Sequence, residues 1–247
     1  MRDLADVKGR VALVTGAGQG IGRTVALRLA EHGASAVVVN DLFPDRAERV
    51  AAEIRGLGTN ALPVIADVTD PQAVKAAAET VSNQLGPVHI LVNNAGVLPG
   101  VGTQAVRRFE ETGPEDWEPW IRLNLYGVML VTRAFLPGML EKGWGRIVTV
   151  ISDASRVGHA GLAAYAAAKA GAAGFMRSLA IEVGKQGVTA NCVSLGYVMT
   201  ETFAGGASQE MLDRAVRRYP VGRFGEPDDV AGAILFLVSD AAAWITG

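Results

Sequence analysis

Short runs of apolar, mostly β-branched residues alternate along the chain with longer, alanine-rich amphipathic stretches. A run with few polar residues is buried on both faces, as in a parallel sheet that helices cover on each side. Strands that alternate with helices throughout predict an α/β fold. We expect one domain over residues 1–247, a doubly wound parallel sheet with helices on both faces. The predicted strands are residues 11–14, 37–39, 62–65, 89–92, 147–151 and 188–193, and the clearest helical stretches are 23–32, 45–57 and 71–84.

Charge and cysteine content exclude several classes of function. The 247 residues include 23 basic and 25 acidic side chains, a net charge of −2, which gives no electrostatic basis for binding nucleic acid or an anionic membrane. Cys192 is the single cysteine, so we expect no disulfide, and the three histidines lack metal-ligand spacing. The first residues do not resemble a signal peptide, and the longest apolar runs fall short of the roughly 18 residues of a membrane span. We therefore expect a cytoplasmic protein without a metal.

A glycine-rich segment, TGAGQGIG at residues 15–22, follows the first predicted strand and precedes a helical stretch. Glycines allow a tight turn and close approach to a pyrophosphate, and the helix N-terminus supplies free N–H groups and a positive dipole end. The spacing differs from G-x-G-x-x-G, and such a segment could by itself be only a tight turn. Its place between strand and helix predicts a nucleotide site formed by Gly16, Gly18, Gln19, Gly20, Ile21 and Gly22.

Asp41 ends the second predicted strand. A carboxylate at this place accepts hydrogen bonds from the adenosine ribose hydroxyls and repels a 2′-phosphate. Neither position 19, which is Gln19, nor the residue directly after Asp41 is basic. Both observations predict NAD rather than NADP as the cofactor, with a simple turn aspartate as the alternative.

Two further strand ends carry polar residues. After the third strand, Asp67 and Val68 are predicted to hold the adenine edge, although a helix N-cap role for Asp67 or Asp70 fits the sequence equally well. The fourth strand ends in the sequence NNAG at residues 93–96. In a doubly wound sheet this segment faces the glycine loop across one crevice, where it would contact a nucleotide; the alternative is an asparagine-stabilised turn.

Tyr165 and Lys169 are four residues apart in an alanine-rich helical stretch, so their side chains project from one face. Ser152 lies at the end of the fifth strand, from which a loop and helix can bring it back to Tyr165. A free tyrosine has a pKa of about 10, and a neighbouring ammonium lowers it toward the working pH. The pattern predicts that Tyr165 donates and accepts a proton.

The chain resembles the short-chain dehydrogenase/reductase family over residues 9–247. The resemblance rests on the glycine loop, Asp41, Asp67 with Val68, NNAG, Asn124 in LNLYG, Ser152, YAAAK at 165–169, RFGEPDDVA at 223–231 and WITG at 244–247. It implies a Rossmann-like fold and a homotetramer or homodimer. NDL at residues 40–42 is similar to NAD-using members. SDASRVG at 152–158 is similar to members that act on alicyclic hydroxyacyl thioesters.

The resemblance also implies a role for each matching residue. Tyr165 would be the general acid and base, Lys169 would lower its pKa and bind the nicotinamide ribose, Ser152 would hydrogen-bond the substrate oxygen, and Asn124 would hold a water of the proton relay. The remaining implied contacts with the cofactor come from Leu42, Asn94, Ala95, Gly96, Val198 and Thr200.

Three departures from the family pattern concern the site and the sheet edge. Leu195 and Gly196 stand where the family has Pro-Gly, and the loop after NNAG is longer than usual. The family continues into a last strand after the position of Gly247, so we expect an open sheet edge and a weaker subunit contact. The substrate site is predicted in loops 98–108 and 197–208.

These features predict an NAD-dependent oxidoreductase that interconverts a secondary alcohol, such as a hydroxyacyl thioester, and a ketone. The first alternative is an NADPH-dependent 3-oxoacyl-thioester reductase of fatty-acid synthesis. The second is a nucleotide-sensing protein without catalysis, against which the complete Ser152, Tyr165 and Lys169 set argues. Among the other residues, His89 is predicted at the surface, His159 in a solvated loop and Trp120 in helix packing.

Overall fold

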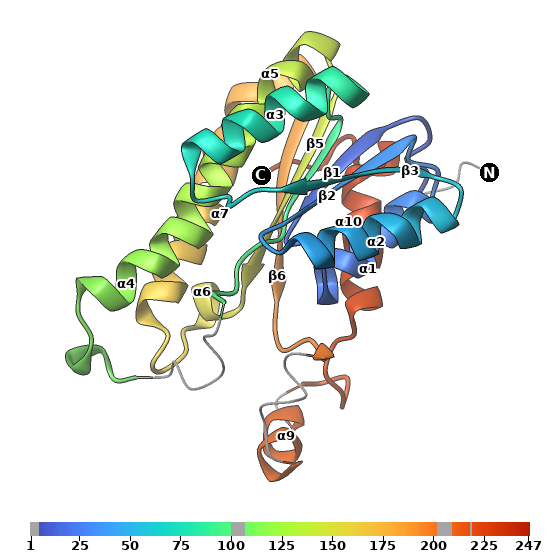
Figure 1. Cartoon of the computed structure of the whole chain (residues 1–247). Coiled ribbons are helices and arrows are strands. Elements are labelled where there is room, and N and C mark those ends of the chain that lie inside the picture. Colours follow the sequence, from blue (N-terminus) through green and yellow to red (C-terminus); the bar gives the residue numbers. More distant parts are fainter. Residues whose placement is uncertain (1–4, 100–106, 202–208, 218) are drawn as a thin grey trace.

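The computed structural model describes residues 5–99, 107–201, 209–217 and 219–247 (Figure 1). Six strands form one parallel sheet in the order β3-β2-β1-β4-β5-β6. This order confirms the predicted doubly wound fold, because the chain builds outward from β1 to one edge and then from β4 to the other. The strands are β1 (Val11–Thr15), β2 (Ala36–Asp41), β3 (Asn60–Ile65), β4 (Ile90–Asn93), β5 (Gly145–Ser152) and β6 (Val188–Leu195).

Helices cover both faces of the sheet (Figure 1). One face is covered by α1 (Gly20–Glu31), α2 (Pro44–Gly56) and α10 (Pro227–Val238). The other is covered by α3 (Pro71–Leu85), α5 (Gly127–Lys142) and α7 (Ala163–Val183). The shorter helices are α4 (Pro114–Ile121), α6 (Ala154–Val157) and α9 (Gln209–Val216), the π-helical turn Arg122–Tyr126, and the 3-10 turns Phe109–Glu111, Gly184–Gln186 and Asp240–Ala242.

Successive residues of β1 point into opposite cores. Ala12 and Val14 pack with α1, α2 and α10, whereas Val11 and Leu13 pack with α3, α5 and α7. Because side chains alternate across a strand, both sets of positions must be apolar when both faces are covered. This double burial explains why the strands read as uninterrupted apolar runs.

The carboxyl ends of β1 and β4 lie side by side at the place where the strand order reverses. Leu13 pairs with Leu91 and Val14 with Val92, so the segments after Thr15 and Asn93 leave the sheet together. In open α/β sheets, ligands bind at this kind of switch point. The fold therefore brings the glycine loop and the NNAG segment together at the switch point.

The helical stretch Pro114–Lys142, which comprises α4, the π-helical turn and α5, has the length and apolar composition of a membrane span. The apolar runs had predicted no such stretch. In the fold, Val131, Phe135 and Met139 of α5 belong to the core between the sheet and the helices. Burial in this layer accounts for the apolar character of these three residues.

The last residues run beside β6, the edge strand. The Gly247 N–H donates to the carbonyl of Ala190, at 3.0 Å, and the Thr246 hydroxyl accepts from the Ala190 N–H, at 3.1 Å. The Asn191 side chain donates to the carbonyl of Ile245, at 2.8 Å. The outer edge of β6 is therefore partly paired rather than fully open.

His89 is half-buried before β4, so its predicted surface position is wrong. Its Nδ1 accepts a hydrogen bond from the N–H of Val11, at 3.2 Å, and its ring meets that of Trp144 edge-on, with centroids 6.2 Å apart. Burial lowers the pKa of His89, and the charges of Arg10 and Lys142 lower it further. Nδ1 can accept this bond only while it carries no proton.

We expect acid to destabilise the fold through His89. A histidine with a lowered pKa in the folded state binds its proton more readily when unfolded. Stability is therefore complete above the ordinary histidine pKa of about 6.5 and is lost as the pH falls below it. The free energy of unfolding, measured by urea denaturation between about pH 8 and pH 5, should decline over that lower range.

The variant His89→Asn isolates this effect, because an amide oxygen can accept from Val11 without titrating. Its unfolding free energy should depend less on pH than that of the native protein. The matched variant His32→Gln, which removes an imidazole elsewhere, should keep the native decline. An identical decline in His89→Asn would contradict the assignment.

Candidate active site

The backbone of the glycine loop between β1 and α1 favours glycine at two positions, at one through its conformation and at the other through close contacts. Gly20 has φ of +53°, a left-handed conformation that glycine adopts without strain. A Cβ atom on Gly22 would lie 2.3 Å from the carbonyl oxygen of Gly16 and 2.5 Å from Nδ2 of Asn94. The segment 93–96 therefore packs directly on the loop, and its predicted contact with a nucleotide stays a prediction.

The N-terminus of α1 follows the glycine loop and has no side-chain cap among the described residues. Gln19 is its N-cap residue, its side chain makes no capping bond within the described part of the chain, and the first turn holds no acidic residue. The first N–H groups of a helix have no partner inside the helix, and they carry the positive end of its dipole. This donor set suits the two negative charges of a pyrophosphate.

Asp41, at the end of β2, is buried beside the loop with 6% of its surface exposed. Its Oδ2 accepts a hydrogen bond from the N–H of Gly18, at 2.9 Å, and its Oδ1 accepts one from Phe43, at 3.0 Å. A carboxylate offers about four acceptor positions, so two remain for the hydroxyls of a ribose. Asp41 therefore lies against the glycine loop, and its predicted contact with the ribose stays a prediction.

The structure separates the alternatives at the ends of β3 and β4. Asp70 is the N-cap of α3 and accepts from the N–H of Gln72, at 2.8 Å, whereas Asp67 accepts from the N–H and hydroxyl of Thr69, each at 2.8 Å. The N-cap interpretation therefore holds for Asp70 alone.

At the end of β4, Asn94 Nδ2 donates to the carbonyls of Thr15 and Gly16, at 2.9 and 3.1 Å. The Asn94 amide therefore links the NNAG segment to the glycine loop, and this structural role does not depend on a bound nucleotide.

Ser152, Tyr165 and Lys169 come together where β5 ends. The Tyr165 hydroxyl is hydrogen-bonded to the Ser152 side chain. Lys169, with 3% of its surface exposed, donates from Nζ to the carbonyl of Val150, at 2.7 Å, and lies 5.9 Å from the centre of the Tyr165 ring. These contacts confirm that the serine returns to the tyrosine.

The predicted lowering of the Tyr165 pKa requires a correction. Burial raises the pKa of Tyr165 above its ordinary value, and the hydrogen bond with Ser152 offsets part of that rise. Burial also lowers the pKa of Lys169 to about 8. The protein's own groups therefore hold the phenol protonated at neutral pH, because desolvation disfavours the phenolate more than the neighbouring groups favour it.

Asn124 lies in the π-helical turn between α4 and α5 and has no exposed surface. Its Nδ2 donates to the carbonyl of Trp120, at 3.2 Å, while its Oδ1 has no partner among the described residues. A Cβ on Gly96 would lie 2.8 Å from this Oδ1 and 2.9 Å from Nζ of Lys169. A buried acceptor without a partner beside an ammonium suits a bound water or hydroxyl group.

Aromatic residues that the sequence assigned to packing or solvent lie next to this site. The Trp120 ring meets that of Tyr165 edge-on, with centroids 5.3 Å apart, so this packing residue also borders the site. His159 is exposed, as predicted, but its ring approaches that of Tyr197, at 6.1 Å. No local pattern marks these contacts, because they join separate segments.

The segment after β6 is anchored by Tyr219, whose hydroxyl accepts a hydrogen bond from the N–H of Tyr197, at 2.7 Å. A Cβ on Gly196 would lie 2.7 Å from the Tyr219 ring, so this ring packs directly against the glycine that follows Leu195. Val198 pairs with Gly225.

Thr200 lies beside the glycine loop, because its Cγ2 is 3.4 Å from where a Cβ on Gly20 would be. In the predicted substrate loops, residues 100–106 and 202–208 lie outside the described residues.

Comparison with known proteins places this geometry in context. A protein-family profile described as "Enoyl-(Acyl carrier protein) reductase" matches residues 16–247. The (2S)-[(R)-hydroxy(phenyl)methyl]succinyl-CoA dehydrogenase subunit BbsD of Thauera aromatica is 39% identical over 243 residues, which are 98% of this chain and 94% of that protein. The 3-oxoacyl-[acyl-carrier-protein] reductase FabG of Vibrio cholerae is 37% identical over 242 residues, 98% and 95% of the two chains.

Among solved structures, a 7α-hydroxysteroid dehydrogenase in complex with NADH and 7-oxo glycochenodeoxycholic acid superposes with a TM-score of 0.92 and 32% sequence identity. The match covers 100% of this chain and 93% of that chain. These relatives act on different substrates, but all are similar to this chain over nearly its whole length.

Proposed function

Because the chain belongs to the short-chain dehydrogenase/reductase family, whose members are oxidoreductases that act on alcohol and ketone substrates with a nicotinamide cofactor, we propose that it interconverts a secondary alcohol and a ketone with NAD. The observation that carries this proposal is the meeting of Ser152, Tyr165 and Lys169 beside the NNAG segment.

In this proposal the chain's own residues move the proton. Tyr165 accepts it from the substrate hydroxyl during oxidation and returns it to the carbonyl oxygen during reduction. Ser152, bonded to the Tyr165 hydroxyl, holds the same oxygen in both directions. The Oδ1 of Asn124, which has no partner in the described part of the chain, and the ammonium of Lys169 hold a water through which the proton leaves.

The cofactor supplies the hydride acceptor and, when oxidised, a positive charge that favours the tyrosine phenolate. Two groups are proposed to hold its adenosine half: the N-terminus of α1, which no side chain of the described residues caps, would bind the pyrophosphate, and Asp41 would bind the adenosine ribose. The other proposed contacts are with Leu42, Asp67, Val68, Asn94, Ala95, Gly96, Val198 and Thr200.

NAD is proposed over NADP because the Asp41 carboxylate is buried beside the glycine loop, so that a 2′-phosphate on a ribose bound to it would meet its charge. Arg49 also contacts the glycine loop, and a cation there could attract a 2′-phosphate. The carboxylate of Glu53, 4.0 Å from the Arg49 guanidinium, offsets that positive charge. An NADPH-dependent 3-oxoacyl-thioester reductase remains the rival, favoured by the similarity to FabG. A nucleotide sensor without catalysis is the other rival.

The substrate proposed first is a hydroxyacyl thioester, since the BbsD relative is named for one. The test is a panel of secondary alcohols and hydroxyacyl thioesters incubated with NAD, in which NADH formation is followed by absorbance. We expect turnover with at least one member of the panel. Turnover only with 3-oxoacyl thioesters and NADPH would support the rival reductase, and nucleotide binding without any turnover would support the sensor.

We also propose a cytoplasmic homo-oligomer. The alanine- and glycine-rich α7 permits close helix packing, and Ile181 on this helix is 86% exposed. Small residues and an exposed apolar side chain on one helix suit a symmetric contact between copies. Light scattering at micromolar concentration measures the assembly, and a monomer would contradict it.

A further inference from the structure

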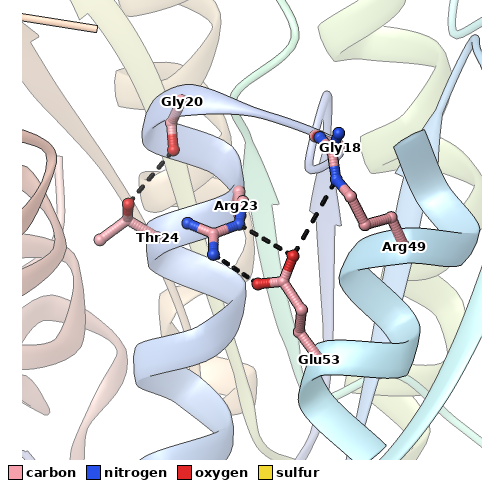
Figure 2. Close-up of polar contacts among 6 residues, drawn as sticks. All are labelled: Gly18, Gly20, Arg23, Thr24, Arg49 and Glu53. Carbon is pink, nitrogen blue, oxygen red and sulfur yellow. Dashed lines mark hydrogen bonds and ion pairs between the residues drawn. The ribbon is translucent and has the colours of Figure 1, made fainter. Parts of the chain in front are cut away.

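One residue of α2, Arg49, contacts the glycine loop, and a second, Glu53, lies between Arg49 and Arg23 of α1 (Figure 2). Nη2 of Arg49 donates a hydrogen bond to the carbonyl oxygen of Gly18, at 2.9 Å. Glu53 lies one turn further along α2, and one of its carboxylate oxygens is 4.0 Å from Nε of Arg49 and 3.3 Å from Nε of Arg23. Arg23 is near the start of α1, the helix that follows the glycine loop. The contacts among Arg49, Glu53 and Arg23 therefore join α2 to α1.

The bond from Arg49 fixes the direction of the next backbone N–H. A trans peptide is planar, so the carbonyl of Gly18 and the N–H of Gln19 point in opposite directions. Because the carbonyl points to Arg49 on α2, the Gln19 N–H points away from α2. No residue in the described ranges accepts a hydrogen bond from it. It is one of the donors that precede the open N-terminus of α1.

Gly18 is also held from its other side. Its N–H donates to Oδ2 of Asp41, at 2.9 Å, so one residue has its amide bound to β2 and its carbonyl bound to α2. Two anchors remove the freedom that a glycine otherwise has about φ and ψ. A loop held in its binding geometry before the ligand arrives has less entropy to lose on binding.

We propose that Arg49 is a positioning residue for the nucleotide loop and that Glu53 is its anchor. Arg49 acts through the Gly18 carbonyl on the direction of the Gln19 N–H, and Glu53 keeps the guanidinium in place while it ties α2 to Arg23. The inference rests on the proposed function for the identity of the nucleotide, but the geometry of the loop is independent of it.

The first test compares Arg49→Met with the native protein. Methionine keeps an unbranched side chain but cannot donate to Gly18. The dissociation constant for NADH, measured by fluorescence titration, should rise roughly tenfold, the lower end for a charged hydrogen bond because Arg49 is mostly exposed. The kcat at saturating NAD should stay unchanged, since the reacting groups are untouched.

Three further variants complete this comparison. Arg49→Lys keeps a donor and should restore part of the affinity, whereas Glu53→Gln should weaken it less than Arg49→Met does. The matched control is Lys75→Met, which breaks the Lys75–Glu79 ion pair of the same spacing on α3, away from the loop. It should leave the NADH dissociation constant unchanged.

Hydrogen exchange of the cofactor-free protein provides a readout that needs no nucleotide. The N–H groups of Gly18 and Arg23 are hydrogen-bonded to Asp41 and to the carbonyl of Gln19. Both should exchange faster in Arg49→Met and not in Lys75→Met. If the native protein fails to bind NADH, the proposed function is wrong, while the exchange rates still test the positioning role.

Two results would overturn the positioning role. One is unchanged exchange in Arg49→Met, which would mean that the loop keeps its geometry without the contact. The other is a loss of affinity for NADPH with no loss for NADH, which would make Arg49 a direct ligand of a 2′-phosphate.

Discussion

Replacing Tyr165 with phenylalanine should lower turnover by roughly 10²–10⁴, the range of general acid–base catalysis, and leave NADH binding intact. The change keeps the ring, and with it the edge contact with Trp120 at 5.3 Å, but removes the hydroxyl bonded to Ser152. In oxidation the substrate hydroxyl then has no base to receive its proton. Turnover on any active substrate of the panel, together with a fluorescence titration with NADH, measures both effects.

The pH profile adds a second criterion. Burial holds the pKa of Tyr165 above its ordinary value, so the protein's own groups leave the phenol protonated at neutral pH. The phenolate is the form that accepts the substrate proton. Oxidation should therefore quicken as the pH rises, and reduction should slow.

Lys169→Ala should lower both turnover and NADH affinity. Lys169 is proposed to hold the water of the proton relay and to bind the nicotinamide ribose, so its loss affects the proton transfer and the cofactor together.

The control for Tyr165→Phe is Tyr126→Phe, which removes a phenolic hydroxyl from a side chain that is 56% exposed. It should keep native turnover. Near-native turnover in Tyr165→Phe, with NADH still bound, would mean that another group carries the proton and that the site has been misassigned.

Replacing Asp41 with alanine should narrow the preference for NADH over NADPH. Two unit charges 4 Å apart repel by about 4 kcal/mol at an effective dielectric of about 20, which converts to roughly a 10³-fold upper limit. Solvent and counterions reduce the effect, so we expect a smaller change. The dissociation constants of NADH and NADPH, measured side by side, give the preference as a ratio.

The ratio matters because Asp41 also holds the N–H of Gly18. Losing that bond in Asp41→Ala should weaken the binding of NADH and NADPH by the same factor. This factor cancels in the ratio of the two dissociation constants, which therefore reports the effect of the charge alone. Asp41→Asn serves as the matched variant, since it keeps the size and an acceptor oxygen but removes the charge. A native protein that binds NADPH as tightly as NADH would contradict the role of Asp41.

Local sequence patterns were sufficient to predict the scaffold of the site. The apolar runs predict strands buried on both faces, and the order of strands and helices predicts the doubly wound sheet. The spacing of Tyr165 and Lys169 places both on one face of α7, and the glycine loop is defined by its place between β1 and α1. Each of these features depends on neighbours in the sequence, so periodicity and backbone chemistry determine them.

The tertiary structure decided what depends on packing between distant segments. The pKa of Tyr165 rises because the fold buries it, and nothing in the spacing to Lys169 reports burial. Asp67 and Asp70 look alike in sequence, and only Asp70 caps α3. Arg49 and Glu53 have the spacing of a common surface ion pair, yet the approach of α2 to the glycine loop brings Arg49 to Gly18 and Glu53 to Arg23. Such contacts are set by how helices pack on the sheet, which no local pattern encodes.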